Sequence, residues 1–345
     1  MARIPGALGA ALLVAASVVT PGPAAACACG GIVSPDPAAR VAEEVALLST
    51  DGHIETVVLR VDLESGSDNA ALVIPTPAPA TVASADAGIF DELATLAAPR
   101  VETQRHWVFG DMPAMRDDAV SGVPVGGPTV LRQVQLGPLQ ATTLAGGDVD
   151  GVRNWLQSNG YPVKRALIDG LQPYLRDGWS TVAMRLTSPV PLNGGLDPVK
   201  LTFASPRLVY PMRMAAHADG PEKVVIYTLG PHRMQRVDPD SRAQQVSVDY
   251  AGTVGGRTVD TTLTGLSANG GYLTALSTVA EPANVSSDFE FGPAPSDEPY
   301  QQLIYRHEYS DITPWIFGGG LAAVAAIALV VAGLRRWLSS SNPGN

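Results

Sequence analysis

Apolar and polar residues alternate along several segments of the chain, which is the period of a β-strand with one buried face. The alternating apolar positions are Val57, Leu59, Val61 and Leu63; Val182, Met184 and Leu186; Val199, Leu201 and Phe203; and Leu208, Tyr210, Met212 and Met214. A continuous apolar run at 224–229 has the length of a strand that is covered on both faces. These patterns predict a body rich in β-sheet.

Apolar residues at helical spacing occur in only a few short segments, mostly in the middle of the chain. Segment 149–156 carries one such stripe and predicts a helix, and 89–96 predicts another. Segment 167–175 carries a third stripe, but Gly170 and Pro173 inside it predict two short helices rather than one. Together with the strands, these helices predict an α+β fold.

Segment 41–48 fits both patterns. Asp51-Gly52 is a tight-turn signal that would make 41–48 the hairpin partner of the strand around 57–63. The spacing of Val41, Val45 and Leu48 also fits a helix. The periodicity leaves both alternatives open.

The first 26 residues have the organisation of a secretory signal peptide. Arg3 precedes an apolar stretch at 7–19 that is too short to span a bilayer, and small residues follow. One cleavage site would leave Cys27 as the first mature residue, and an overlapping site would leave Cys29 first. We therefore expect 1–26 to be absent from the mature protein.

The other end of the chain carries a longer apolar segment. Residues 315–334 contain no charge, and a helix of that length, at about 1.5 Å per residue, matches a hydrocarbon core of roughly 30 Å. Arg335-Arg336 follow this segment and Asp311 precedes it, so the positive flank is expected to face the cytoplasm. The sequence thus predicts a single transmembrane helix with a cytoplasmic tail at 335–345 and everything before it outside.

Prolines separate the body from this apolar segment. Residues 27–280 are expected to form the extracytoplasmic body, and 281–314 a stalk, because the latter has few apolar residues before Leu303. The prolines of this segment are Pro282, Pro293, Pro295, Pro299 and Pro314. The expected protein is a cell-membrane protein with one span, displayed outside the cytoplasm.

The net charge of the chain limits the classes of partner that it can bind. Among 345 residues, 23 Lys and Arg stand against 33 Asp and Glu, which gives a net charge of −10. Such a chain repels nucleic acid and anionic lipid surfaces. We expect no nucleic-acid partner, and contacts instead with the membrane, other envelope proteins or cell-wall material.

Several stretches together resemble a bacterial envelope family known as domain of unknown function 2330. The stretches are 29-CGG-31, 71-ALVIPTPAPATV-82, 89-IFDELATLAAPR-100, 155-WLQSNGY-161, 174-YLRDGWSTVAMRL-186 and 208-LVYPMRM-214. The resemblance covers about 27 to 280 and implies an exported protein with a mixed strand and helix body, often a carboxy-terminal membrane helix, and no established activity. It also implies that 41–48 is a strand, and it marks Cys29-Gly30-Gly31 as a motif to test.

Cys27 and Cys29 are the only cysteines of the chain. A disulfide between them is compatible with an oxidising exterior, although a ring so small would contribute little stability. One cysteine alone could act after cleavage, or the pair could carry redox or metal chemistry, because two thiolates bind copper(I) or zinc. A lipid anchor is disfavoured, since Ala24 stands where lipidation requires a larger aliphatic residue.

Catalytic motifs are missing from the sequence. It contains no G-x-S-x-G, H-E-x-x-H or S-x-x-K, and the histidines show no metal-ligand spacing. His307-Glu308 is better explained as solvated charge than as an acid-base pair. Asp148-Val149-Asp150-Gly151 lacks the glutamate that would complete a calcium loop, so Asp148 is interpreted as a helix cap.

Tryptophans are the remaining candidate contacts. Trp155 and Trp179 are interpreted as core anchors, whereas Trp107 has polar neighbours and is the candidate for an exposed ligand contact. We expect a non-catalytic binding or scaffolding domain with no cofactor. The alternatives are a thiol-redox or metal-handling protein that uses Cys27 and Cys29, and a hydrolase with a dispersed site.

Overall fold

The computed structural model describes residues 26–27, 29–108, 140–144, 149–254, 256–268, 270–311 and 313–340. The strands are β1 (Ala26–Cys27), β2 (Gly30–Val33), β3 (Arg40–Thr50), β4 (Ile54–Glu64), β5 (Asn69–Thr76), β6 (Thr81–Ser84), β7 (Arg100–Val108), β8 (Gln140–Leu144), β9 (Ser180–Thr187), β10 (Asn193–Gly195), β11 (Val199–Ala204), β12 (Leu208–Tyr210), β13 (Glu222–Gly230), β14 (Met234–Arg236), β15 (Val246–Thr253), β16 (Tyr272–Ala280), β17 (Phe289–Pro293), β18 (Tyr300–Gln301) and β19 (Leu303–Asp311). The helices are α1 (Ile89–Leu96), α2 (Val149–Ser158), α3 (Arg165–Arg176), α4 (Thr261–Ser267) and α5 (Thr313–Ser340), with the 3-10 turns η1 (Arg213–His217), η2 (Pro239–Arg242) and η3 (Pro282–Asn284).

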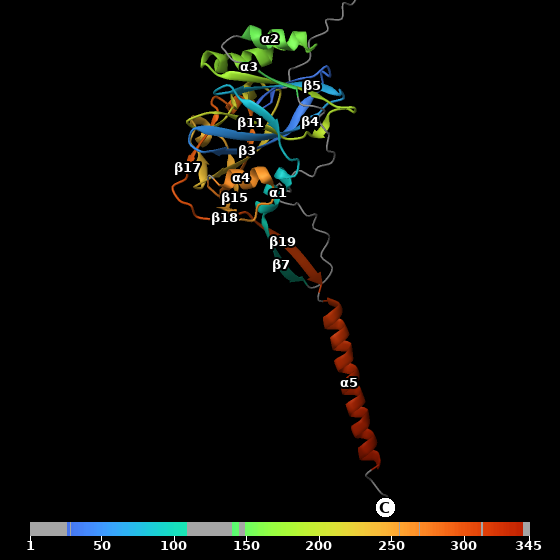
Figure 1. The fold of residues 1–345 in the computed structure, drawn as a ribbon. Coiled ribbons are helices and arrows are strands. Elements are labelled where there is room, and N and C mark those ends of the chain that lie inside the picture. Colours follow the sequence, from blue (N-terminus) through green and yellow to red (C-terminus); the bar gives the residue numbers. More distant parts are fainter. Residues whose placement is uncertain are drawn as a thin grey trace, which may run out of the picture.

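The body consists of stacked sheets with helices on the two outer faces (Figure 1). A nine-stranded sheet has the order β18-β15-β16-β13-β3-β4-β11-β6, and β10 also pairs with β4. Its strands are antiparallel except for the parallel pair β3 and β13. A five-stranded sheet, β1-β2-β5-β9-β8, and a three-stranded sheet, β12-β17-β14, accompany it. The sheet-rich body predicted from the alternating pattern is therefore what the structure shows.

The main core lies between the large sheet and the two smaller ones. Leu59 and Ile226 from the large sheet belong to one buried cluster with Leu72 of the five-stranded sheet and Phe289 of the three-stranded sheet. Each such side chain contributes about 1.5–3 kcal/mol when fully buried. This shared core fixes the three-stranded sheet against the large sheet.

Helices cover the outer faces. Phe90 and Leu93 of α1 pack with Leu263 of α4 on the far side of the large sheet. On the other side of the body, Leu156 of α2 and Leu171 of α3 cover the five-stranded sheet. Helix α2 and strands β4, β9, β11 and β13 confirm the corresponding sequence predictions.

Segment 41–48 is a strand. It lies within β3, which pairs with β4 in an antiparallel hairpin. Gly52 adopts a positive φ of 95° in the turn, and the Asp51 carboxylate accepts the backbone N–H groups of His53 and Ile54 at 2.9 and 2.8 Å. The turn signal was therefore the better guide, and the helical alternative was wrong.

Two other predictions were wrong in detail. The alternation at 208–214 suggested one strand, but β12 ends at Tyr210, because Pro211 follows and the chain turns into η1. The helical stripe at 167–175 lies on the single helix α3, although Gly170 and Pro173 are inside it. Gly170 is buried against η1, where an added Cβ would lie 3.3 Å from a ring carbon of His217, so packing accounts for the glycine.

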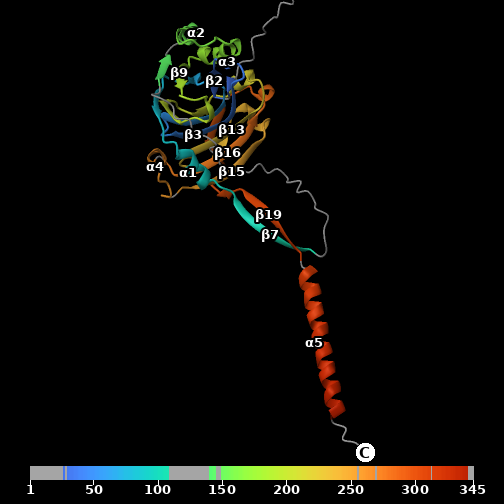
Figure 2. The ribbon, with the colours of Figure 1, turned by 90° about the vertical axis from the view of Figure 1, so that its right-hand side faces the viewer.

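The segment expected to form a stalk is divided between two structures. Its first part is folded into the body, where Phe289 of β17 is 1% exposed and pairs with Tyr210. Its last part, β19, pairs in parallel with β7 in a two-stranded ribbon. Figure 2 shows this ribbon leading from the body toward α5.

The transmembrane helix predicted at 315–334 is not supported. Within the part of the chain that the structure describes, no helix has the length and apolar character that a membrane crossing requires.

Candidate functional site

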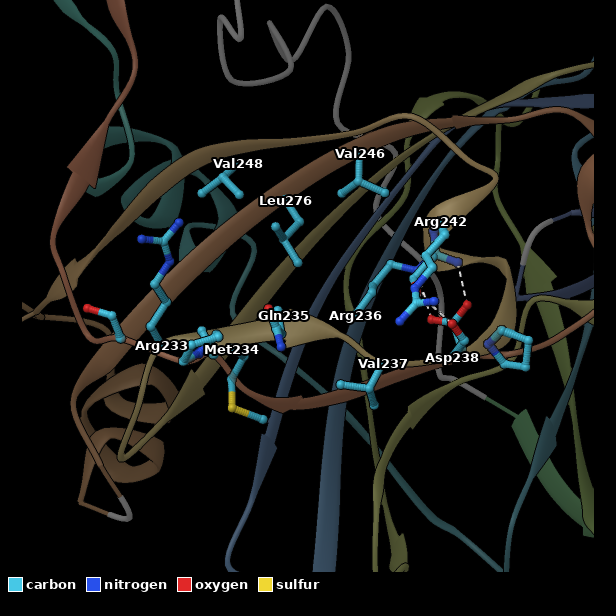
Figure 3. Close-up of a pocket in the computed structure, with 15 residues that line it drawn as sticks. Arg233, Met234, Gln235, Arg236, Val237, Asp238, Arg242, Val246, Val248 and Leu276 are labelled. Atoms are coloured by element: carbon cyan, nitrogen blue, oxygen red, sulfur yellow. Dashed lines mark hydrogen bonds and ion pairs between the residues drawn. The ribbon is translucent and has the colours of Figure 1, made fainter.

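A pocket of about 860 Å³ opens between β14 and the neighbouring part of the large sheet (Figure 3). Strand β14 and the turn that follows it form one side, and β15 and β16 form the other. Its volume lies in the range of about 300–1,000 Å³ that is usual for ligand sites. The pocket is the candidate functional site.

The floor of the pocket is apolar. Val246 and Val248 of β15 and Leu276 of β16 line it, and their side chains point toward β14 (Figure 3). The two valines are half-buried, and Leu276 belongs to the main core. A ligand seated here would cover apolar surface that the fold itself leaves open.

One wall is a buried ion pair. Arg236 donates to both oxygens of Asp238, at 2.9 Å from Nε and at 2.6 Å from the other guanidinium nitrogen. The two side chains are only 4% and 1% exposed. The Arg236 guanidinium also donates to Gln244 at 2.8 Å and lies 3.5 Å from the centre of the Phe289 ring. These contacts fix the wall in place, and the charges of Arg236 and Asp238 neutralise each other, so neither is free to bind a ligand.

Two further arginines, Arg233 and Arg242, stand at opposite ends of the pocket (Figure 3). The Arg233 guanidinium donates to the backbone carbonyl of Glu298 at 3.0 Å, and Arg242 is exposed on η2. Among the described residues, neither guanidinium forms an ion pair with a carboxylate. The two charges therefore remain available to an anionic ligand.

The Asp297 carboxylate already accepts hydrogen bonds from within the protein. Asp297 accepts the Arg233 N–H at 2.8 Å and the His232 ring nitrogen Nδ1 at 2.9 Å. These hydrogen bonds, that from His232 first, lower the pKa of Asp297 below its usual range. Asp297 thus fixes the start of β14 as a charged group at neutral pH.

Comparison with known proteins places the chain in a family. A family model described as "Uncharacterized protein conserved in bacteria (DUF2330)" matches residues 23–292. The chain belongs to this family. The DUF2330 match confirms the resemblance found in the sequence, and it includes the strands around the pocket up to β17, but neither β19 nor α5.

The other comparisons add little to the DUF2330 assignment. No curated protein sequence matches the chain. The crystal structure of baculovirus P35 aligns with 73% of this chain and 97% of its own, at 11% identity and a TM-score of 0.40. That score is too low to indicate a shared fold.

The DUF2330 motif Cys29-Gly30-Gly31 has a packing role. A Cβ added to Gly30 would lie 2.3 Å from the carbonyl oxygen of Val73, and one added to Gly31 would lie 2.1 Å from the Leu167 side chain. Strand β2 therefore passes too close to the backbone of β5 for a side chain at position 30, whereas a side chain at position 31 would require the Leu167 side chain to move.

The cysteine of this motif is part of a buried polar cluster. The Cys29 N–H and the Tyr210 hydroxyl both donate to the same Glu44 oxygen at 3.0 Å. These three residues are at most 1% exposed. Burial, together with Cys29 and Glu44, raises the pKa of Tyr210 well above its usual range. The cluster joins β12 to the large sheet and lies in the core, not in the pocket.

The predicted pairing of Cys27 with Cys29 is not shown. Cys27 lies in β1 opposite Gly30, and the side chain of Cys27 is outside the described atoms. Among the side chains that the structure describes, no disulfide is present. Cys29 belongs to the main hydrophobic cluster, where oxidants have little access.

The histidines are less scattered than the sequence suggests. Parallel pairing of β7 with β19 brings Nε2 of His106 within 2.9 Å of Nδ1 of His307. Glu308, the sequence neighbour of His307, pairs instead with Arg105 at 3.7 Å. The described residues contain no group of three or more His, Cys, Asp or Glu side chains arranged to hold a metal ion.

The tryptophan interpretations divide. Trp155 and Trp179 pack against the cluster beneath α2 and α3, which confirms them as core anchors. Trp107 lies in β7, but its side chain is outside the described atoms, as is the proposed cap Asp148.

Sequence reasoning missed the pocket itself. Arg233 and Arg242 belong to no motif, and β14 is too short at three residues to show a period. Val246, Val248 and Tyr250 do alternate, and that signal could have located the strand that carries the floor. Only the folded chain reveals that this strand faces β14 across a gap.

Proposed function

We propose that the body is a binding module whose ligand occupies the pocket beneath β14. The observation that carries the proposal is the combination of an open apolar floor with guanidinium groups at both ends, Arg233 and Arg242. Such a site suits a ligand with an apolar middle and anionic groups. Arginine is well matched to carboxylates and phosphates because its planar fork can donate two parallel hydrogen bonds.

The side chains in the wall of the pocket favour ligand binding over catalysis. Both oxygens of Asp238 already accept hydrogen bonds from Arg236, so this carboxylate is poorly placed to take a proton from a substrate. Ser241 donates its hydroxyl to the backbone carbonyl of Asp238 at 2.7 Å. A non-catalytic role therefore fits the pocket better than the hydrolase alternative, and the buried Cys29 gives no support to the thiol-redox one.

Export through the amino-terminal signal predicted from the sequence would place this pocket outside the cytoplasm. There it would meet other envelope proteins or cell-wall material. The net charge of −10 makes two unpaired arginines on one pocket a local exception, which favours an anionic partner for this face alone.

Calorimetric titration of the full chain with decanoate tests the proposal. Decanoate carries an apolar chain and one carboxylate, and decanol is the matched neutral probe. Because decanoate has one carboxylate, it can meet only one of the two guanidinium groups at a time, so we expect the Arg233→Ala Arg242→Ala double variant to bind it about tenfold more weakly, the size of one charge-assisted hydrogen bond. Arg165→Ala, on α3 and 93% exposed, is the control and should change nothing.

The opposite results would remove the proposal. If decanoate and decanol bind equally, the arginines do not recognise charge. If decanoate does not bind, or binds the Arg233→Ala Arg242→Ala double variant as well as the parent, then the pocket is not the binding site.

A further inference from the structure

Strand β14 is an edge strand, and its pairing with β17 decides which backbone groups face outward. The Arg233 carbonyl accepts the N–H of Ala294 at 2.7 Å, and the Val237 N–H donates to the Glu290 carbonyl at 2.8 Å. In an antiparallel ladder, alternate residues point to opposite edges. The backbone groups of Met234 and Arg236 therefore point away from β17, which agrees with Pro293, a residue without an N–H, lying opposite Met234.

The outer edge of β14 faces the large sheet across the pocket. The Met234 N–H donates to the Thr274 hydroxyl of β16 at 3.0 Å. The remaining outward groups are the Met234 carbonyl and the N–H and carbonyl of Arg236, and the described part of the chain supplies no partner to these three. The pocket wall thus presents an acceptor, a donor and an acceptor in the order of an unfilled strand edge.

We propose that the ligand is an extended acidic polypeptide segment that adds to the outer edge of β14 as a further strand. This inference rests on the proposed function and names the class of its ligand. The backbone of the segment pairs with the outward groups of Met234 and Arg236, since strand addition uses main-chain hydrogen bonds for affinity. Its apolar side chains contact Val246 and Val248, and its acidic side chains reach Arg233 and Arg242.

The lining and the charges of the pocket agree with a short segment. Five residues in extended conformation span roughly 17 Å, and alternate side chains point to one face. A segment with two apolar residues on one face and an acidic residue at each end therefore matches the floor and both arginines. A fatty acid offers one carboxylate and no hydrogen-bonding backbone, so it would leave the edge of β14 unfilled.

The test uses acetyl-Glu-Val-Thr-Val-Glu-amide and the full chain, with binding measured by calorimetry. Two further peptides carry one N-methyl group each, on the threonine or on the second valine, so that one of the two loses a donor on the edge that faces β14 without a change of charge. We expect one of these N-methylated peptides to bind at least tenfold more weakly than the parent. A charge-swap pair then fixes the contact: Arg242→Glu should weaken the acidic peptide and gain affinity for a peptide with lysine at one end.

The results separate this inference from the proposed function. Equal binding of the parent and both N-methylated peptides would overturn strand addition, because the backbone would then not be read. Binding of decanoate with no binding of the peptide would overturn the inference and leave the proposed function standing. If neither probe binds, both fall.

Discussion

The three-stranded sheet has two outer edges, β12 and β14, and the protein treats them differently. On β12, the Val209 N–H points away from β17 and donates to the buried carboxylate of Glu55 at 3.1 Å. On β14, the corresponding outward groups face an open pocket. Exposed strand edges invite pairing with other chains, and proteins usually cover them. The chain therefore covers the Val209 N–H of β12 with its own buried side chain, whereas the outward backbone groups of Arg236 on β14 face the pocket.

The largest expected effect comes from disrupting the Arg236–Asp238 ion pair that forms the wall of the pocket beside β14. Asp238→Asn leaves the Arg236 charge buried and unpaired, so we expect unfolding free energy to fall by about 3–5 kcal/mol. Urea titration measures the loss. The control is Glu64→Gln, which breaks an exposed pair with Arg40 and should cost at most about 1 kcal/mol. Equal losses would show that the wall is not a structural element of the pocket.

A second change concerns strand β2, which is buried and passes close to β5. Gly30→Ala forces a Cβ against the Val73 carbonyl oxygen, and backbone yields poorly, so we expect a loss of about 1–3 kcal/mol. Gly31→Ala meets the flexible side chains of Leu167, at 2.1 Å, and Met214, at 3.3 Å, and should cost less. Gly220→Ala, with open space around its Cβ, is the control. Thermal or urea unfolding of the three variants should follow that order, and a reversed order would contradict the packing role.

A third change tests Glu55, the residue that covers the β12 edge, through the pH dependence of the unfolding free energy. Burial raises the pKa of Glu55 well above its usual range, so the folded chain retains a proton that the unfolded chain loses above about pH 4.5. The stability that Glu55 contributes is full below the unfolded pKa and is lost as pH rises through the folded pKa, by up to about 1.4 kcal/mol per pH unit. Glu55→Gln keeps the acceptor for Val209 and removes the proton.

The measurement for Glu55 is unfolding free energy against pH for both proteins. The difference between Glu55→Gln and the parent should grow in favour of the variant above about pH 4.5. Two parallel curves would mean that Glu55 titrates alike in the folded and unfolded chain.

The smallest expected effect concerns the open edge. Arg242 is exposed and forms no ion pair among the described residues, so Arg242→Ala should change stability by no more than about 0.5 kcal/mol. A thermal shift assay without ligand measures this. A large loss of stability would show that Arg242 holds η2 in place and that its charge is not reserved for a ligand.

The sequence predicted the covered parts of this protein well and the open part poorly. Strand β4 buries its alternating apolar residues, and β13 is buried on both faces, as its continuous apolar run predicted. The motif Cys29-Gly30-Gly31 was visible for a similar reason, since close packing restricts residue type. Motifs of this kind mark where the chain packs tightly against itself.

The sequence did not predict the pocket, because segments that are separated along the chain form it together. The floor lies on β15 and β16 and the arginines lie on either side of β14, and no spacing in the sequence expresses that one faces the other. The pairing of β7 with β19 was hidden in the same way, because it joins segments about 200 residues apart. A local pattern carries no information on which distant strand completes a sheet.

The ribbon of β7 and β19 determines how the body would respond to force. Both strands leave the body at the same end, and β19 continues toward α5 (Figure 2). Tension applied through α5 would pull β19 lengthwise along β7. The paired positions from Leu303 to Asp311 would then share the load in shear, instead of separating one after another as in an unzipping hairpin. The parallel pairing would therefore place the link between α5 and the domain that carries the pocket under shear.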